Sequence, residues 1–571
     1  MIPAAAKDRS RACLDRLGER PGWLPAAVLA GLGLALAAAG CQPSKPQVRP
    51  GVLTISQEQV GSWIRNFNPL IPGGTARWPT LSGIYEPLFV FNAMTSQYVP
   101  WLATGYQWQD GNQTLEMMIR TKVLWSDGTP FSAADVAFTF NLLRQHPGLD
   151  VRRIWNFLES VEVEGDSLVR FAFSRTYVPG LDSLAGQPIV PRHIWSEIED
   201  PVKFSNPQPV ATGPFTEVLR FDTQVWELGR NPRYWQKGKP AVEALRFPAF
   251  PSNEQVTLAL INGEIDWAGN FIPAIDRIFV KRDPEHHHYW FPRAGGSIFL
   301  YPNHTRPPLD RVEVRKALSL AIDRDQVVRV AMHDYTIPAH PTALADGMQK
   351  WRSEPATREG DWVAFDPERA EAMLDQAGYC LGPDGQRHGP DGTALTLQLN
   401  VVTGWSDWMR AAQVISQNLK RVGITAQVKN HDFGAWFSQM QKAEFDLSIG
   451  WAEKGPTPYP LYRGLMSAEL VRPVGEVAET NWHRFGLEEM DSLCRTFEQT
   501  SDPEESLKLV HRMQELFVQH APAIPLFAEP SWGEFNTRRF TGFPSQENPF
   551  AQISPNSIPE NLLVLVALKP R

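Results

Sequence analysis

Hydrophobic positions recur along the chain with two different periods, and these periods predict both strands and helices. Residues 51–59 (GVLTISQEQ) and 167–174 (SLVRFAFS) alternate between apolar and polar positions, which is the period of a strand. Residues 114–128 predict a pair of strands that ends in a turn at Asp127 and Gly128. Strands are therefore expected from the first half of the chain onwards.

Apolar stripes at helical spacing predict several amphipathic helices. The clearest start is at 132–145, where Ser132 precedes the stripe and Asp135 stands at the capping-box position. Further amphipathic helices are expected at 311–332, at 366–378 with Gly378 as C-cap, and at 409–423 with Gly423 as C-cap.

The order and number of these elements predict an α/β architecture in two lobes. The helix at 409–423 is followed at once by a strand-like run at 424–430, which makes one α/β unit. With 571 residues, the chain is longer than one hydrophobic core usually supports, so two or more lobes are expected. The 20 Trp against 11 Tyr are an unusual excess of large rings, which needs a reason in the fold or in the ligand.

The first forty residues predict a secretory signal. A basic stretch at 1–20 precedes an uncharged apolar run at 24–40, and Cys41 follows directly. The ending AAGC resembles the lipobox of bacterial lipoproteins, although Ala38 stands where Leu is commoner. The resemblance implies cleavage before Cys41, acylation of its thiol and a tether at 41–50. The alternative is an uncleaved anchor helix, and both interpretations tie the folded part to a membrane on the periplasmic side or at the cell surface.

Charge and motif content argue against several classes of function. Without residues 1–40 the chain keeps 50 Lys and Arg against 60 Asp and Glu, a formal net charge of −10, which argues against a nucleic-acid partner. No G-x-x-x-x-G-K-[ST] phosphate loop and no G-x-S-x-G elbow occur. Histidines 286–288 would alternate faces in a strand, so we expect a hydrogen-bonded stretch, with no metal and no cofactor. Cys380 and Cys494 could pair in an oxidising compartment or stay free.

Several long segments resemble one protein family over nearly the whole chain after the signal. WSDGTPFSAADVAFT at 125–139 and RNPRYW at 230–235 are the most specific of them. GIYEPLFVFN, IVPRHIW, ATGPF, NGEIDWAG and PAIPLF also match, and all segments stand in the family's order. On these motifs the chain is identified as a member of the family 5 extracellular solute-binding proteins, which are the binding subunits of bacterial ABC importers.

The resemblance implies a periplasmic-binding-protein type II-like α/β fold, in which two lobes joined by a hinge close on a ligand held between them. It also implies a monomer that is not an enzyme and that passes its ligand to ABC permease subunits. An extracytoplasmic hydrolase is an alternative from another class, because many enzymes lack short signatures. The implied parts are lobe one at 51–302 with an extra subdomain at 85–215, lobe two at 303–522, and a return to lobe one at 523–571.

One loop indicates the class of ligand. Peptide-binding members of the family usually carry an aspartate in a pattern like G-W-x-A-D-Y, and it pairs with the ammonium group of the peptide. The matching stretch at 449–464 keeps Trp451, but Glu453 and Lys454 follow it and the aspartate is missing. GPTPY, GWSDW and NWHR resemble the branch that binds cello-oligosaccharides. An oligosaccharide is therefore the expected ligand, and an oligopeptide is the alternative.

Sugar recognition also fits the abundance of Trp. An aromatic ring covers the apolar face of a pyranose, and short polar side chains satisfy its hydroxyls. Trp405 and Trp408 are expected to be ring platforms with Asp407 as a hydroxyl acceptor, and core packing of both rings is the alternative.

Other candidates have structural alternatives as well. Trp267 is as compatible with the core as with the site, while Trp482 could pack the scaffold and Arg484 could form a surface ion pair. No catalytic residue is expected. The expected ligand-binding residues are Trp78, Trp267, Asn270, Trp405, Asp407, Trp408, Trp451, Tyr459, Asn481, Trp482 and Arg484.

Overall fold

The computed structural model describes residues 49–57, 59–71 and 79–571. Residues Arg49–Arg571 form one unit, and all elements below belong to it. The expected signal peptide, the lipidation site Cys41 and the candidate Trp78 lie outside the described residues.

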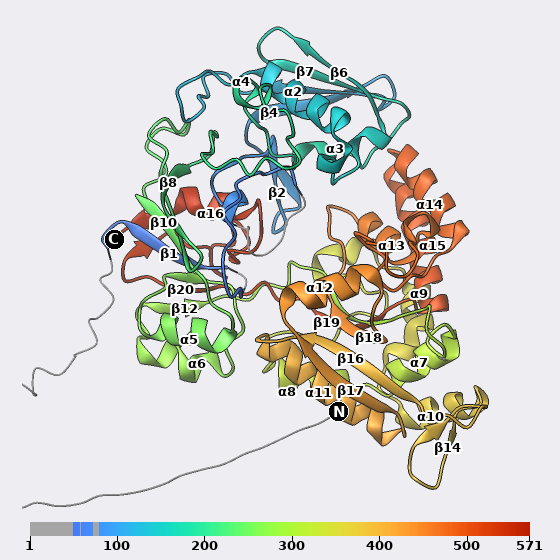
Figure 1. The fold of residues 1–571 in the computed structure, drawn as a ribbon. Helices are drawn as coiled ribbons and strands as arrows, with labels where there is room; N and C mark the ends of the chain where they lie inside the picture. The colour runs from blue at the N-terminus through green and yellow to red at the C-terminus, as the bar shows by residue number, and fades with distance from the viewer. Residues whose placement is uncertain (1–48, 58, 72–78) are drawn as a thin grey trace, which may run out of the picture. The chain divides into compact units, whose positions relative to one another are not determined.

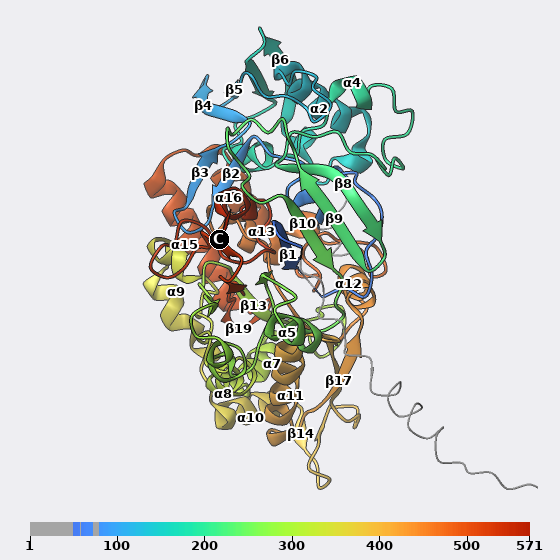
Figure 2. The ribbon, with the colours of Figure 1, turned by 90° about the vertical axis from the view of Figure 1, so that its left-hand side faces the viewer.

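A seven-stranded sheet forms the centre of lobe one, and β1 (Val52–Ser56) lies in its middle (Figure 1). β1 pairs in parallel with a strand on each side, and all five of its residues are buried, as in strands that are covered on both faces. The strand expected at the start of the folded part is confirmed. The order is β12 (His287–Tyr289), β20 (Glu534–Asn536), β11 (Trp267–Ala268), β1, β10 (Ala244–Pro248), β9 (Val225–Arg230) and β8 (Phe215–Asp222). Figure 2 shows β10, β9 and β8 side by side.

A four-stranded antiparallel sheet and α2 (Ala133–Gln145) form the part expected as the extra subdomain. The predicted capping box is confirmed, because the Ser132 hydroxyl accepts from the Ala134 amide and Asp135 Oδ2 accepts from the Ser132 amide at 2.9 Å. Of the two strands expected at 114–128, the second is wrong, since Leu124 forms only an isolated bridge to Pro130. The elements here are β4 (Ala103–Gln109), β5 (Thr114–Ile119), β7 (Leu168–Phe173) and β6 (Leu158–Glu164) in sheet order, the hairpin β2 (Phe89–Asn92) and β3 (Gln97–Pro100), α3 (Gly180–Ala185) and α4 (Arg192–Trp195).

A five-stranded sheet forms the centre of lobe two. β16 pairs in parallel with β17 and β18, and α11 (Ser406–Arg421) packs against β16 and β17, so the predicted α/β unit is confirmed. The order is β17 (Thr425–His431), β16 (Thr396–Val402), β18 (Leu447–Gly450), β13 (Ser297–Pro302) and β19 (Ile524–Ala528).

The helix expected at 311–332 is two helices, α7 (Val312–Leu320) and α8 (Arg324–Ala331). Asp323 causes the break, because its carboxylate accepts from the Gln326 amide and starts a new helix. The helices predicted at 366–378 and 409–423 form as α10 (Pro367–Gln376) and α11. Gly378 and Gly423 follow them with φ of +85° and +82°, as helix C-caps require.

The remaining helices and short strands complete both lobes. In lobe two, α13 packs against α14 and α15, and these three helices form a layer beside the sheet. The elements are α5 (Asn253–Ile261), α6 (Ile275–Ile278), α9 (Glu354–Glu359), α10 (Pro367–Gln376), α12 (Phe433–Lys442), α13 (Tyr459–Met466), α14 (Glu488–Gln499), α15 (Pro503–His520), α16 (Asn561–Ala567), β14 (Cys380–Leu381), β15 (Arg387–His388), β21 (Phe540–Thr541) and β22 (Lys569–Pro570).

The chain crosses between the lobes before β13 and returns after β19. The sequence-based bounds at 302 and 523 assign both strands to lobe one, but they pair with each other in the lobe-two sheet, where β13 also pairs with β18. Every residue of β13 and β19 is buried, so hydrophobicity alone could not tell which sheet would take them. After the return, α16 joins the hydrophobic core of lobe one.

Candidate functional site

A cavity of about 1590 Å³ lies between the lobes and is lined by residues of both. Lobe one contributes residues such as Asn253, Asn270 and Trp532, and lobe two contributes Trp405 and the loop that begins at Trp451. The volume is above the range of roughly 300–1,000 Å³ that is typical of pockets for drug-sized molecules. The cavity therefore has room for a ligand of several sugar or amino-acid units.

The two lobes touch directly on one side of this cavity. The Asn253 amide donates to the Gly404 carbonyl at 3.1 Å, and Asn253 Nδ2 donates to Ser406 Oγ at 3.3 Å. Gly404 has a φ of +88°, and a Cβ on it would lie 2.5 Å from the Pro251 carbonyl oxygen. The close approach of the lobes therefore requires glycine at position 404.

A second contact between the lobes closes the other side. The Val178 amide, from the subdomain of lobe one, donates to the Glu498 carbonyl of α14 at 2.8 Å. Arg175 Nη1 lies 2.7 Å from Glu498 Oε2, and the Tyr459 hydroxyl donates to Glu498 Oε1 at 2.5 Å. Glu498 thus joins α13 of its own lobe to the subdomain of the other.

Trp405 and Trp408 stand at the start of α11. Trp405 is the N-cap residue, and the two ring centroids are 4.9 Å apart with an interplanar angle of 79°. Their exposed fractions are only 9% and 6%, and both belong to the core of lobe two while also lining the cavity. Each ring therefore packs on the core with one side and forms cavity wall with the other, and whether they bind a ligand stays a prediction.

Asp407 stands between Trp405 and Trp408 in the sequence and lies at the contact between the lobes that Asn253 makes. Its side chain is buried and hydrogen-bonds with Asn253 of the opposite lobe. Burial raises the pKa of Asp407 to about 6, although hydrogen bonds at the helix start, the Asn253 side chain and the Arg410 charge favour the carboxylate.

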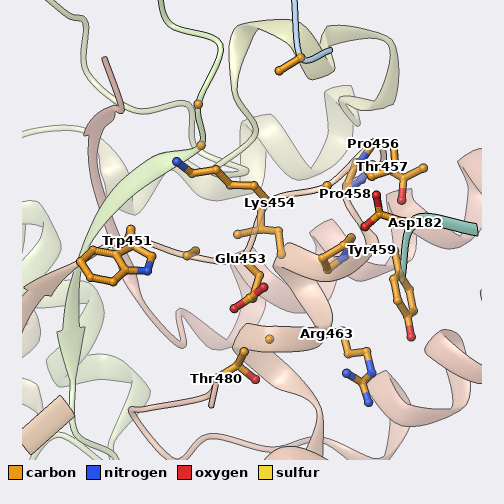
Figure 3. Close-up of a pocket in the computed structure, with 18 of the residues that line it drawn as sticks. Asp182, Trp451, Glu453, Lys454, Pro456, Thr457, Pro458, Tyr459, Arg463 and Thr480 are labelled. Carbon is orange, nitrogen blue, oxygen red and sulfur yellow. The ribbon is translucent and has the colours of Figure 1, made fainter. Parts of the chain in front are cut away.

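The loop after β18 carries two further candidates, and Figure 3 shows both. The Trp451 ring is half-buried beside Trp436, with centroids 5.2 Å apart. Tyr459 begins α13 and stacks on Phe497 at a centroid distance of 5.2 Å and an angle of 9°. Both residues line the cavity.

Asn270 lines the cavity from lobe one. The Asn270 backbone N–H donates to Glu534 Oε2 at 3.2 Å, and burial holds the pKa of Glu534 well above its ordinary value. Asn270 Oδ1 is shielded from water and has no hydrogen-bond partner among the described residues. The neighbouring rings of Phe271 and Trp532 are 5.6 Å apart at the same wall.

Four expected site residues do not line the cavity. Trp267 is fully buried and donates from Nε1 to the Ile553 carbonyl at 2.7 Å. Asn481 bonds within its own loop, and the Trp482 ring packs edge-on against Trp451 at 5.8 Å. Arg484 donates to the carbonyls of Gln441 and Glu476 and stabilises the loop through backbone oxygens, not through the surface ion pair considered above.

Several cavity residues were missed by sequence reasoning. The Pro-rich composition of the 451–464 loop could have pointed to Lys454 and Arg463, but the other positions carry no local signal. These other residues are brought together by the fold and include Gln59, Asn253, Phe271, Glu529, Trp532 and Asn556.

The residues that the structure describes hold neither a metal-ligating cluster nor a membrane-spanning helix. No group of three or more His, Cys, Asp or Glu there could hold a metal ion. His287 instead stacks on Phe279 at 4.1 Å and bonds to the Phe279 carbonyl, as expected for a hydrogen-bonded stretch. In the same residues, no helix is both long and apolar enough to cross a membrane. Cys494 is buried and Cys380 is exposed, and the two do not pair.

A two-lobed α/β chain with a large cavity between the lobes has the architecture of a solute-binding protein. Residues 97–469 match the bacterial extracellular solute-binding proteins, family 5 (Middle), and the chain belongs to this family. The expected family is thereby confirmed, and the protein is a substrate-binding subunit of an ABC importer that acts on the extracellular or periplasmic side.

Similar proteins have names that mention different ligands. The glutathione-binding protein GsiB of Salmonella choleraesuis (strain SC-B67) is 25% identical over 503 residues, covering 85% of this chain and 90% of that protein. A mannohexaose-bound periplasmic oligopeptide-binding protein of Thermotoga maritima has a TM-score of 0.83 and 24% identity, covering 92% and 99% of the two chains. AppA of Bacillus subtilis, in complex with a nonapeptide, has a TM-score of 0.76 and 18% identity, covering 92% and 99%. These structures confirm the expected two-lobed type II fold.

Proposed function

We propose that this subunit captures an oligosaccharide in the interlobe cavity and delivers it to the permease. The observation that carries the proposal is a cavity wall in which neutral hydrogen-bonding side chains stand beside aromatic rings. The neutral side chains include Gln59, Asn270, Trp405 and Asn556, and each has one polar atom without a hydrogen-bond partner among the described residues.

These side chains suit hydroxyl groups better than charged groups. A polar group of the wall that is left without a partner when the ligand binds costs about 1–3 kcal/mol, and a sugar hydroxyl can both donate and accept to supply that partner. Aromatic side chains stand in the same wall, with Phe271 and Trp532 from lobe one and Trp405 and Trp408 from lobe two. An apolar ring face beside neutral hydrogen-bonding groups is what a pyranose requires.

The loop at Trp451 supports the same conclusion. The peptide-binding pattern places its aspartate three residues after the tryptophan, and that position is Lys454 here. Lys454 Nζ forms an ion pair with Glu529 at 2.6 Å. The ammonium group of a peptide would meet a cation at this position. The Thermotoga maritima protein bound to mannohexaose adds support from a similar fold.

An oligopeptide is the second candidate, and it rests on two cavity groups. Glu453 and Arg463 both line the cavity and form no hydrogen bond or ion pair with other described residues. Burial raises the pKa of Glu453, against the charges of Arg152, Lys454 and Arg463. The Glu453 carboxyl group and the Arg463 guanidinium fit a ligand that carries one ammonium and one carboxylate group. The similar glutathione-binding proteins also favour this candidate.

Calorimetry with matched neutral oligosaccharides and tripeptides tests the proposal. We expect oligosaccharide binding that weakens in Asn270→Ala by about tenfold, because the variant lacks the amide that completes the hydroxyl contacts. Asn400→Ala is the matched control, since Asn400 also has a buried Oδ1 without a described partner but lies outside the cavity. Binding of peptides alone would reject the oligosaccharide, and shortened sugars after incubation would indicate a hydrolase.

A further inference from the structure

Arg463 differs from the other basic residues that line the cavity. Seven Lys and Arg residues of the described chain line it, and most are paired or exposed at the rim. Lys454 pairs with Glu529, Arg175 with Glu498 and Arg495 with Glu469. Arg463 alone among them is partly buried and forms no hydrogen bond or ion pair with a described residue.

The position of Arg463 on α13 directs it to one end of the cavity. It follows Tyr459 by four residues and therefore shares a helix face with it, and Figure 3 shows both on α13 beside Glu453. The groups that act on its charge are Tyr459, Tyr177, Cys494 and Glu498. The guanidinium therefore lies where α13, α14 and the subdomain of lobe one meet.

Arg463 keeps its positive charge at this end of the cavity. Burial disfavours the cation of Arg463, yet the neighbouring Tyr459, Tyr177, Cys494 and Glu498 outweigh it and raise the pKa of Arg463. Burial raises the pKa of the Cys494 thiol to about 12 and that of the Tyr459 phenol far above its ordinary value, so both groups are uncharged at neutral pH.

Glu498 forms no ion pair with Arg463, and each of its oxygens has another partner. Oε1 accepts from the Tyr459 hydroxyl at 2.5 Å, and Oε2 lies 2.7 Å from Arg175 Nη1. Glu498 thus pairs with Arg175 and not with Arg463. A guanidinium presents five N–H donors in a planar fork, and the fork of Arg463 is left for an acceptor from outside the protein.

We propose that Arg463 binds a carboxylate of the ligand, so that the imported solute is an acidic saccharide with its uronate at the α13 end of the cavity. This inference rests on the proposed function, since the sugar rings would occupy the neutral wall at Asn270 and Trp405. The same carboxylate chemistry could come from the C-terminus of a peptide, and the experiment below separates the two sources.

The test measures four affinities by calorimetry with the full folded domain. The probes are a neutral oligosaccharide, the same oligosaccharide with a terminal uronate, a tripeptide and its C-terminal amide. We expect the uronate to bind about 10- to 100-fold more tightly than its neutral partner, as a charge-assisted bidentate pair would give. Arg463→Gln should remove this difference, and Arg463→Lys should restore part of it.

The control and the outcomes separate this inference from the proposed function. Arg306→Gln removes an arginine that pairs with Asp446 at 2.8 Å outside the cavity, and it should leave every affinity unchanged. Equal binding of the uronate and the neutral sugar overturns the inference but supports the proposed function. A third outcome is that only the peptides bind, with the C-terminal amide weaker than the free tripeptide and the difference lost in Arg463→Gln. That outcome would make Arg463 the site of a peptide carboxylate and would overturn the oligosaccharide as the ligand. Binding of no probe by the folded protein overturns both.

Discussion

Arg175 Nη1 of lobe one lies 2.7 Å from Glu498 Oε2 of lobe two. Beside this pair, the Val178 amide donates to the Glu498 carbonyl at 2.8 Å. The chain thus has contacts of its own that favour the closed arrangement, in addition to those that a ligand would make. A ligand shifts such an equilibrium only by its different affinity for the two arrangements, so these contacts contribute to the affinity without touching the ligand.

Weakening this pair should therefore loosen closure. Glu498→Gln removes one charge of a partly exposed ion pair, which is worth up to about 1 kcal/mol, so we expect ligand affinity to fall about two- to fivefold. Small-angle scattering should show a larger radius of gyration without ligand. Glu469→Gln breaks the exposed pair with Arg495 within lobe two and serves as control. An unchanged radius and affinity in Glu498→Gln would mean that the pair does not hold the lobes.

Trp405 and Trp408 belong to the core of lobe two and also line the cavity, so replacing them should affect both stability and binding. Trp405→Phe and Trp408→Phe should each cost about 1–3 kcal/mol of unfolding free energy, because both rings are nearly buried in the core. If they are also platforms, affinity should fall about two- to tenfold, because phenylalanine keeps a smaller ring for stacking. Trp436 is the matched control, since it belongs to the same aromatic cluster but does not line the cavity. Equal loss of stability with unchanged affinity would make all three rings core residues.

Sequence patterns were sufficient where local chemistry decides the structure. Ser132 and Asp135 cap α2 through groups only three residues apart, and Gly378 and Gly423 end their helices where a positive φ is needed. Such features are independent of the rest of the chain, so one sequence is enough to find them.

The rest depends on contacts between distant parts of the chain. β13 and β19 are buried throughout, and only the pairing of β13 with β18 and β19 shows that both strands belong to lobe two. Arg463 becomes a distinct group only because Arg175, from almost three hundred residues earlier, already occupies Glu498. Asn481 and Arg484 have the residue types of a sugar site, but the fold uses both to stabilise a loop.

Asp407 predicts a dependence of stability on pH. Its pKa is about 6 in the folded protein against about 3.9 in an unfolded chain, so between these values the folded state holds more protons. The free energy of unfolding should therefore fall as the pH rises from 4 to 6, by up to about 3 kcal/mol from this group. Asp407→Asn should remove this part of the slope in urea unfolding at pH 4.5 and 7. Parallel curves for the two proteins would contradict the assignment.

The ending AAGC predicts a lipid anchor on Cys41, which lies outside the described residues. Wild-type protein expressed in a bacterial host should incorporate labelled palmitate and be found with the membrane. Cys41→Ala should leave an unlabelled precursor, while Cys380→Ala, at an exposed thiol of the folded domain, should be labelled normally. Label retained on Cys41→Ala would refute the lipoprotein assignment.

Gly404 predicts that one added methyl group can hold the lobes apart. A Cβ at this position would lie 2.5 Å from the Pro251 carbonyl oxygen of the opposite lobe, and backbone atoms cannot move aside as a flexible side chain can. Gly404→Ala should therefore enlarge the radius of gyration and weaken ligand binding by about tenfold or more.

The backbone strain of this substitution needs its own control. Gly385 also has a positive φ, of +75°, but a Cβ there would meet no atom within 4 Å. Gly385→Ala should cost about 1 kcal/mol of stability from the unfavourable φ alone and leave closure intact. If the two variants lose the same stability and both still close on ligand, the contact of Gly404 with the opposite lobe does not limit closure. If only Gly404→Ala stays open, the approach of residues 251–253 to the start of α11 is required for the bound state.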